Sequence, residues 1–284
     1  KITLLMAILA VSTYMSAATG WFNDFLTIKV DGVETANNYY IGTDPVSGAT
    51  AFQGKAFGLV TTLEITGADM KYWSDSQDRT GAAFYYKVTN TANTFEFIPA
   101  TEIILDHAFL TGNDYQGTKT TTLNVLSGLP AGAYQLHIWA KSWGSGQGDS
   151  WLSNSSANYV ATFMKAPAST APMSGTYKVG NTLDANFNSL SGAVNAINAY
   201  GVGGDVLLEI ATNLTEPADV SLGVNTGSYK VTIKPAVSAT PTITFTNIGA
   251  SVSIDGHFVI GSPSANTASL IPTNNITIDG SNTV

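Results

Sequence analysis

Residues 184–204 read DANFNSLSGAVNAINAYGVGG, and at this stretch the pattern of the chain changes. Apolar residues recur here at steps of three and four, which is the period of one helix face. The spacing predicts an amphipathic helix that is capped at its start by Asp184 or Asn186 and ended by Gly201 in the left-handed conformation. Its apolar positions are Phe187, Leu190, Ala193, Val194 and Ile197.

Beyond this helix the chain holds short runs with apolar side chains at alternate positions. Each run is soon ended by Gly, Asn, Asp or Pro, and short strands repeated after turns are typical of a solenoid of β-coils. We therefore expect residues 176–284 to begin a parallel β-helix that continues past residue 284, with the predicted helix covering its open end. A second β-sandwich is the alternative. The runs are Val206/Leu208/Ile210, Val231/Ile233, Ile243/Phe245, Val252/Ile254 and Ile276/Ile278.

Upstream, residues 19–164 show a different arrangement, in which about seven β-type runs alternate with turn signals. That spacing predicts an antiparallel β-sandwich of immunoglobulin-like type, with Tyr134 at the place of a tyrosine corner. The segment KAPASTAPMSG (165–175) combines two prolines with small residues and is expected to be a linker. The runs are DFLTIKV (24–30), GLVTTLEI (58–65), AAFYYKV (82–88), TFEFI (94–98), TTTLNVL (120–126), AYQLHIWA (133–140) and NYVATFM (158–164).

Composition narrows the classes of function. Only 11% of the 284 residues are charged, against about 25% in an average soluble protein. The net charge is −8 and Arg79 is the only arginine, so we expect no nucleic-acid partner, because phosphate binding needs clustered Lys and Arg. Cysteine is absent, which excludes disulfides, thiolate metal sites and Cys nucleophiles.

The first residues, KITLLMAILAVSTYMSAATG, predict export. A lysine, an apolar run from Ile2 to Val11 and a small-residue exit at Ser16–Ala18 make up the pattern of a secretory signal peptide over residues 1–18. The apolar run is too short to span a bilayer as a stable anchor. We therefore expect a secreted or surface protein with no transmembrane anchor in this chain.

Two longer segments, residues 174–217 and 229–245, resemble a module of large secreted or cell-surface proteins of Bacteroidota-type bacteria. They read SGTYKVGNTLDANFNSLSGAVNAINAYGVGGDVLLEIATNLTEP and YKVTIKPAVSATPTITF. The resemblance implies a right-handed parallel β-helix of the pectin-lyase type, type IX secretion and a place outside a Gram-negative cell. The sandwich segments YQLHIWAKS and SNSSANYVATF resemble domains of the same proteins. There the segment often reads Gly-Gly-x-Asn-Tyr, whereas this chain has Ser155, Ser156 and Ala157 before Asn158-Tyr159 and so lacks the glycines. The expected fold is thus all-β, a sandwich followed by a helix-capped parallel β-helix.

Two Ile-Asp-Gly triplets raise the question of a paired-carboxylate site. They place Asp255 and Asp279 24 residues apart, a plausible length for one coil, which would bring the two carboxylates about one strand spacing apart. Such a pair could share a proton or a cation, as glycoside hydrolysis requires. Asp-Gly is also among the best turn formers, and we favour the interpretation as one turn repeated. His257 follows one triplet and is interpreted as a solvated side chain.

A second candidate site lies in QLHIWAKSWGSGQGDSWL (135–152). Strand alternation places His137, Trp139, Lys141 and Trp143 on the face opposite the predicted core, and Trp151 follows in the next loop. Aromatic rings stack on sugar rings, and Lys141, Asp149 and Asn154 could bond hydroxyls. This combination predicts a glycan-binding surface, while packing of the tryptophans beneath a neighbouring loop is the alternative.

These residues together favour a non-catalytic, adhesin-like or glycan-binding surface protein. A polysaccharide lyase or glycoside hydrolase, with catalytic coils beyond residue 284, is the alternative. We expect no cofactor. The loops DSQDR (75–79) and GNDYQGTK (112–119) carry oxygen ligands that could bind calcium, although neither has the spacing of an EF-hand loop. The sequence leaves the ligand and the oligomeric state open.

Overall fold

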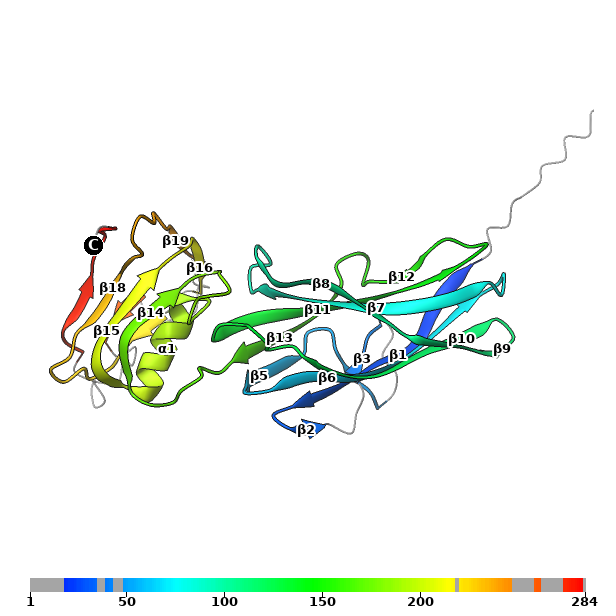
Figure 1. The fold of residues 1–284 in the computed structure, drawn as a ribbon, viewed down its shortest axis with the longest axis horizontal. Coiled ribbons are helices and arrows are strands. Elements are labelled where there is room, and N and C mark those ends of the chain that lie inside the picture. The colour runs from blue at the N-terminus through cyan, green and yellow to red at the C-terminus, as the bar shows by residue number, and fades with distance from the viewer. Residues whose placement is uncertain are drawn as a thin grey trace, which may run out of the picture.

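The computed structural model describes residues 18–34, 39–42, 48–217, 220–246, 258–261 and 273–282. Within these ranges the chain is mostly β, with one helix, and forms two regions placed end to end along the long axis (Figure 1). The larger region is built from two mixed sheets and the smaller from short parallel sheets. No helix among the described residues is long and apolar enough to cross a membrane. The predicted signal peptide falls almost wholly outside the described ranges.

The first sheet of the larger region has seven strands, in the order β4-β3-β1-β6-β10-β9, with β2 paired to β1. Its neighbours are antiparallel except for β3 and β4, which run parallel. The strands are β1 (Thr19–Val30), β2 (Val33–Glu34), β3 (Tyr39–Tyr40), β4 (Thr50–Ala51), β6 (Leu63–Ser74), β9 (Asp106–Thr111) and β10 (Asp114–Asn124).

The second sheet has six strands, in the order β5-β13-β11-β7-β8, with β12 paired to β11. Strand β13 runs parallel to β5, so the prediction of purely antiparallel sheets is wrong at this pair and at β3–β4. Local alternation indicates a strand but not the direction of its neighbour. The strands are β5 (Ala56–Val60), β7 (Arg79–Asn90), β8 (Glu96–Ile104), β11 (Gly132–Gly144), β12 (Ser150–Leu152) and β13 (Tyr159–Lys165).

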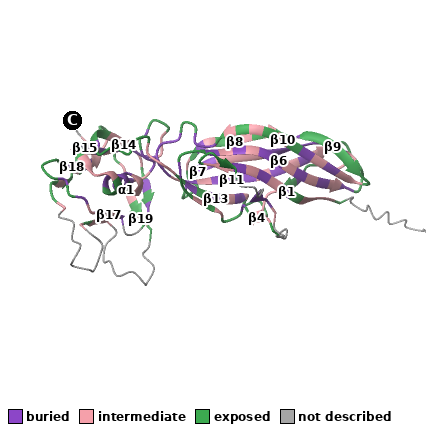
Figure 2. Ribbon diagram, turned by 90° about the horizontal axis from the view of Figure 1, so that it is seen from below, coloured by how far each residue is buried: buried purple, intermediate pink, exposed green. Residues whose placement is uncertain are grey.

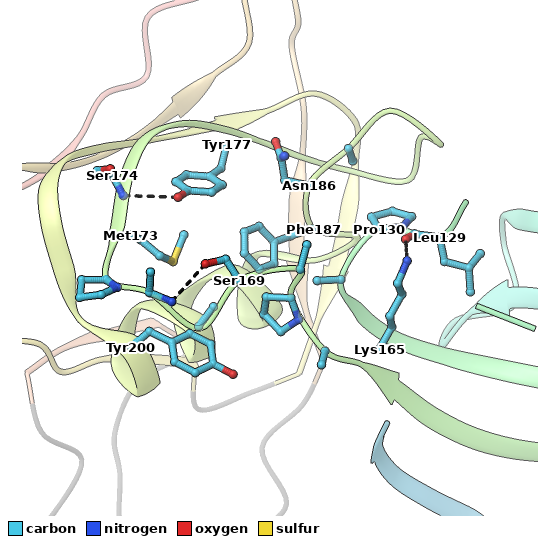
Figure 3. A pocket seen from close by; sticks show the side chains of 18 residues that line it. Leu129, Pro130, Lys165, Ser169, Met173, Ser174, Tyr177, Asn186, Phe187 and Tyr200 are labelled. Carbon is cyan, nitrogen blue, oxygen red and sulfur yellow. Dashed lines mark hydrogen bonds between the residues drawn. The ribbon is translucent and has the colours of Figure 1, made fainter. Parts of the chain in front are cut away.

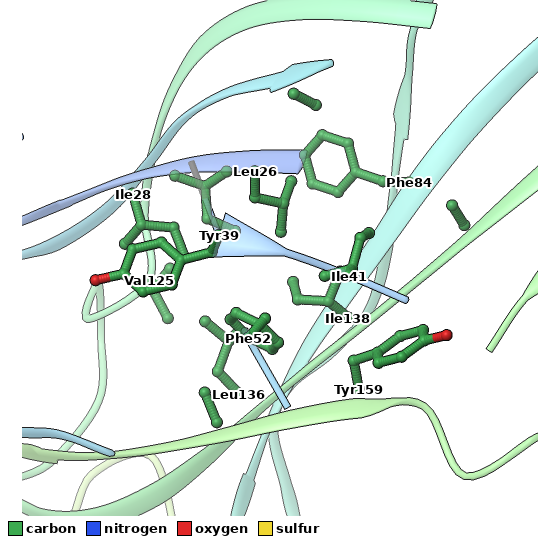
Figure 4. Close-up of a cluster of buried hydrophobic side chains, with 14 of the residues drawn as sticks. Leu26, Ile28, Tyr39, Ile41, Phe52, Phe84, Val125, Leu136, Ile138 and Tyr159 are labelled. Atoms are coloured by element: carbon green, nitrogen blue, oxygen red, sulfur yellow. The ribbon is translucent and has the colours of Figure 1, made fainter. Parts of the chain in front are cut away.

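The core of this region fills the space between its two sheets. Because successive side chains of a strand point to opposite faces, buried residues alternate with more exposed ones along strands such as β1 and β6 (Figure 2). Leu26 and Ile28 on β1 point towards Leu136 and Ile138 on β11, with Phe84 on β7 beside them (Figure 4). All five are fully buried. For Leu136 and Ile138, the alternation in the AYQLHIWA run predicts this burial.

Tyr134 anchors the start of β11. Its ring is fully buried, and its hydroxyl donates a hydrogen bond of 2.7 Å to the carbonyl of Pro130. This hydrogen bond, from a tyrosine to the backbone a few residues upstream, is the one that a tyrosine corner makes. The prediction for Tyr134 is therefore confirmed, and burial raises the pKa of its hydroxyl, which stays a donor.

The smaller region consists of three short sheets whose described pairs are all parallel, as the coil pattern predicts. The largest has the order β14-β15-β18-β21, and β16–β19 and β17–β20 form the other two. Side chains at alternate positions, such as Leu208 and Ile233, point into a shared core. The strands are β14 (Met173–Val179), β15 (Val202–Ile210), β16 (Leu214–Glu216), β17 (Val220–Leu222), β18 (Val231–Pro235), β19 (Ile243–Phe245), β20 (Phe258–Ile260) and β21 (Ile276–Ile278).

The one described helix, α1 (Leu190–Tyr200), packs its apolar face onto this core. It ends before Gly201, as predicted, and the N–H of Gly201 bonds the carbonyl of Ile197. Gly201 has a positive φ of 76°, but its ψ of −172° differs from that of the predicted left-handed helical conformation.

The predicted start of α1 is wrong. The N-cap is Ser189, whose hydroxyl accepts from the N–H of Gly192 at 3.1 Å. The side chains of the two predicted caps both accept from Lys178 instead, that of Asn186 from its N–H and that of Asp184 from its ammonium.

A buried carboxylate adds a second cap to α1. Glu216, at the end of β16, accepts hydrogen bonds from the N–H groups of Leu190 (2.6 Å) and Ser191 (3.0 Å). The first N–H groups of a helix have no partner within it and carry partial positive charge, so a carboxylate there is favourable. The start of the helix is thereby joined to strand β16.

The two regions are also joined by backbone hydrogen bonds, which lie outside the predicted linker at 165–175. The N–H of Ala131 bonds the carbonyl of Asn186 at 2.9 Å, and the N–H of Asn188 bonds the carbonyl of Ala131 at 2.9 Å. The side chain of Asn188 donates to the carbonyl of Ala133 at 2.6 Å. Gly132 has a φ of 142°, and a Cβ at that position would clash with Asn188. Strand β14 also begins inside the predicted linker, at Met173.

Replacing Tyr134 by Phe tests the anchor of β11. The carbonyl of Pro130 would lose its buried donor, so we expect the free energy of unfolding to fall by about 1–3 kcal/mol in urea denaturation. Tyr229→Phe, at an exposed position, is the matched control and should have little effect. Equal losses in the two variants would contradict this role.

Replacing Glu216 by Gln tests the cap of α1. One hydrogen-bond acceptor and the favourable charge at the helix start would be lost, at a cost of about 1–2 kcal/mol. Amide hydrogen exchange should then accelerate by about tenfold in α1 relative to the sandwich. Glu64→Gln in β6 is the control, and unchanged protection of α1 in Glu216→Gln would rule the cap out.

Candidate functional site

Three of the predicted site residues lie together on β11. Trp139, Lys141 and Trp143 point away from the core, on the outward face of the second sheet, and each is partly exposed. Strand β12 folds back along β11 and places Trp151 beside Lys141. The structure therefore brings together four of the five residues expected to form a glycan-binding surface.

Tyr85 on β7 joins this group, although it was not predicted. It is the register partner of Trp139, and the two rings are nearly parallel at 8°, with centroids 5.4 Å apart. The ring of Trp151 lies 6.2 Å from that of Tyr85. Alternation in AAFYYKV is enough to put the side chain of Tyr85 on the other face of the strand from the core residue Phe84. That Trp139 is its neighbour on β11 depends on the register of the two strands, which the alternation does not give. We call Tyr85, Trp139, Lys141, Trp143 and Trp151 the aromatic surface.

The rings of the aromatic surface differ in how much of each face is free. Trp143 rests on Gly81, where a Cβ would lie 2.5 Å from the ring, so a side chain there would displace it. Tyr85 and Trp139 partly cover each other. Trp151 is 52% exposed and offers the largest open ring.

Lys141 lies among these rings. Its Nζ is 5.5 Å from the ring centroid of Trp143 and 5.3 Å from that of Trp151, and it forms an ion pair of 3.4 Å with Asp149. A cation over an aromatic face is attracted to the negative charge of that face. The ammonium group therefore helps to hold the two tryptophans in place.

The loop that leads into β12 is fixed by the only arginine of the chain. Arg79 is buried and donates to the carbonyls of Gln147 (2.8 Å) and Gly148 (3.0 Å). Asp78 accepts from the N–H groups of Gly146 (2.7 Å) and Gln147 (2.6 Å). Burial would raise the pKa of Asp78, but hydrogen bonds from Ser74, from these N–H groups and from Arg79 lower it well below its usual range. The ion pair thus fixes where Trp151 stands.

The same contacts bear on the calcium prediction. In the loop at 75–79 both oxygens of Asp78 accept hydrogen bonds from the protein, and Asp75 in this loop accepts from Asn113 and from the N–H of Ala18. Across the described ranges, the structure contains no group of three or more His, Asp or Glu side chains that could hold a metal ion. Calcium binding in these loops therefore has no support among the described residues.

His137 does not reach the aromatic surface. It shares the outward side of β11 but is only 3% exposed, and its Nε2 lies 2.9 Å from the hydroxyl of Thr89. Burial, followed by the nearby ammonium of Lys87, lowers the pKa of His137 to about 4. The ring is therefore neutral at pH 7 and is not presented to a ligand. Asn154 is also occupied, since its side chain donates to the carbonyl of Asn158.

Of the possible acid pair Asp255 and Asp279, the structure describes only Asp279. Asp279 comes directly after β21, and its carboxylate accepts from the N–H (2.8 Å) and hydroxyl (3.0 Å) of Ser281, which lower its pKa. This is the local turn bonding that favours Asp before Gly. In this sheet Ile278 is in register with Ile233, much more than 24 residues earlier. Asp255 and His257 lie outside the described residues.

The neighbours of Asp279 across the sheet have charges of alternating sign. Lys178 on β14 is in register with Glu209 on β15, and Glu209 with Lys234 on β18. Asp279 follows next, beside Lys234. We call Lys178, Glu209, Lys234 and Asp279 the charge ladder. The ammonium of Lys178 forms its ion pair with Asp184 at 2.6 Å, so the ladder is an arrangement of opposite charges in register. Such an arrangement favours the pairing of neighbouring strands.

A cavity of about 470 Å³ lies where the two regions meet (Figure 3). Its wall includes Met173, Tyr177, Phe187 and Tyr200. The one cation in the wall, Lys165, donates to the backbone carbonyls of Leu126 and Leu129, and burial lowers its pKa. The ammonium is occupied by the protein, so the cavity offers a ligand no free charged group.

Comparison of the chain with protein-family models, with curated proteins and with solved structures finds no match. No family is identified, and the function of the aromatic surface has to be argued from its chemistry.

The burial of His137 predicts a pH dependence of stability. Its pKa is about 4 when folded and about 6.5 when unfolded, so stability is full above pH 6.5 and falls as the pH drops towards 4. We expect His137 to account for about 2–3 kcal/mol of that fall. Urea denaturation at pH 7 and pH 4.5 should therefore show a smaller fall for His137→Gln than for the unsubstituted chain. Identical falls would show that His137 is not responsible.

Proposed function

We propose that this chain is an exported protein that binds glycans through the aromatic surface of its β-sandwich. The observation that carries the proposal is the set of tryptophan and tyrosine rings on the outward face of one sheet. The faces of aromatic rings pack against the C–H faces of sugars, and a group of partly exposed aromatics marks an interaction site. Trp151 supplies the open face, and Tyr85 and Trp139 extend it.

The rigidity of the aromatic surface supports this role. Trp139 and Tyr85 are carried by β11 and β7, which lie inside the sheet, and Trp151 is held by the Arg79–Asp78 ion pair through the preceding loop. Side chains that are already ordered lose little entropy when a ligand binds. Asp149 and Glu102, the hydrogen-bond partner of Tyr85, supply acceptors for sugar hydroxyls at the edge of the rings.

The architecture supports the wider part of the proposal. We propose that the sandwich is immunoglobulin-like, which the hydrogen bond of Tyr134 favours, and that the parallel sheets begin a right-handed β-helix capped by α1. Such a molecule would act outside a Gram-negative cell, of Bacteroidota type, after type IX secretion. The signal-like first 18 residues are in keeping with export. A polysaccharide-cleaving enzyme, the alternative, would need catalytic coils outside the described residues.

Removing the open ring tests the glycan site. We expect Trp151→Ala to weaken retention on a bound polysaccharide by about tenfold, because truncating an exposed aromatic anchor removes a large part of the binding energy. Affinity electrophoresis through gels that contain xylan, glucomannan or hydroxyethyl cellulose would measure this. Trp73→Ala in β6, at a half-buried tryptophan of the other sheet, is the matched control.

Two outcomes would contradict the glycan proposal. One is that the unsubstituted chain moves through every polysaccharide gel as it does through a gel without polysaccharide. The other is that Trp151→Ala and Trp73→Ala lose retention equally. Circular dichroism and thermal unfolding of both variants would show that a loss does not come from unfolding.

A further inference from the structure

The ion pair inside the aromatic surface presents its acid rather than its base to solvent. The side chain of Lys141 is 23% exposed, whereas that of Asp149 is 44% exposed. The ammonium is covered by the rings of Trp143 and Trp151. A ligand that approaches Trp151 therefore meets the carboxylate of Asp149 before the ammonium of Lys141.

The same order recurs at the next ion pair along β7 and β8. Lys87 is 18% exposed and bonds Glu96, which is 47% exposed, at 2.7 Å. Between the two ion pairs stands Glu102, an exposed residue that accepts from the hydroxyl of Tyr85 and has a neutral partner. Two carboxylates, Asp149 and Glu102, thus border the rings, a third lies further along the sheet at Glu96, and both lysines near them are mostly covered.

From this arrangement we infer that the aromatic surface selects neutral polysaccharides and rejects those that carry uronate or sulfate groups. The inference rests on the proposed glycan-binding function and names the class of sugar that the surface takes. A neutral sugar brings hydroxyl donors, and Asp149 and Glu102 accept hydrogen bonds. An anionic sugar brings charge of the same sign as Asp149 and Glu102. The two nearby lysines, Lys141 and Lys87, are already paired with carboxylates.

Electrostatics beyond the contact points acts in the same direction. The chain has a net charge of −8, and its only arginine is buried in the ion pair with Asp78. The field of the whole protein therefore slows the approach of an anionic polymer. Charges in the ligand that lie within about 10 Å of Asp149 and Glu102 are only partly screened at low salt.

Polysaccharide pairs that share a backbone and differ in the charge of their substituents test the inference. Hydroxyethyl cellulose is compared with carboxymethyl cellulose, and methyl-esterified homogalacturonan with the same polymer after de-esterification. At an ionic strength of about 0.01 M, where screening is weak, we expect the chain to bind the neutral member at least about tenfold more tightly. At about 1 M salt the difference should shrink to less than threefold.

Variants assign the selectivity to the aromatic surface. The double variant Glu102→Gln and Asp149→Asn removes two charges and keeps one acceptor oxygen at each position, so its affinity for neutral polymers should fall while its discrimination against charge is lost. The quantity compared is therefore the ratio of the affinities for the neutral and the anionic member of each pair. In the double variant this preference for the neutral member should fall at least threefold at low salt. Glu34→Gln with Asp106→Asn removes two exposed charges from the other sheet and is the matched control, expected to keep the preference.

The outcomes separate this inference from the function on which it rests. If neither member of any pair is retained, the glycan-binding function itself falls, and the selectivity with it. If polysaccharides bind through Trp151 but the anionic member binds as tightly as the neutral one or more tightly, only the selectivity is overturned. A preference that survives in the double variant would also overturn the assignment to Asp149 and Glu102.

Discussion

The alternation of side chains along β11 is the constraint on which the sandwich and its surface both depend. Leu136 and Ile138 point into the core, while Trp139 and Lys141, which follow them, point outward. Shifting the strand by one residue would exchange the two sets and bury an ammonium group in place of a hydrocarbon. Tyr134, bonded to Pro130, fixes the strand at its beginning. Core packing and the aromatic surface are therefore set by the same register.

Charged residues are scarce in this chain, and several of them are committed to structure. Arg79 and Asp78 hold the loop before β12, so a buried ion pair determines where Trp151 stands. Removing either partner would leave the other as an unpaired buried charge. The stability lost in this way is larger than the net stability that the ion pair contributes. Glu216 accepts a hydrogen bond from the first N–H group of α1 and so caps the start of the helix. These contacts explain how a chain with few charges still orders its loops and its helix.

The parallel region is joined to the sandwich by the segment around Asn188, which bonds the backbone on both sides of Gly132. The residues before α1 therefore hold the two regions together as well as leading into the helix. On the outer face of the largest parallel sheet, the charge ladder pairs each strand with a neighbour of opposite charge. Parallel strands far apart in sequence lack the short turn that sets register in a hairpin, and side-chain ladders can supply it.

Local periodicity was enough to predict the helix, the change of pattern at residue 184, the core side of β11 and the common face of Trp139, Lys141 and Trp143. Each of these depends on residues that are near in sequence. Only the tertiary structure decided that Tyr85 lies against Trp139, that His137 is buried and that Ser189 caps the helix. It also gave two strand pairs a parallel direction and placed Ile278 beside Ile233. Pairing across strands depends on contacts between distant segments, and an alternating pattern is the same for either direction and for any even shift of register.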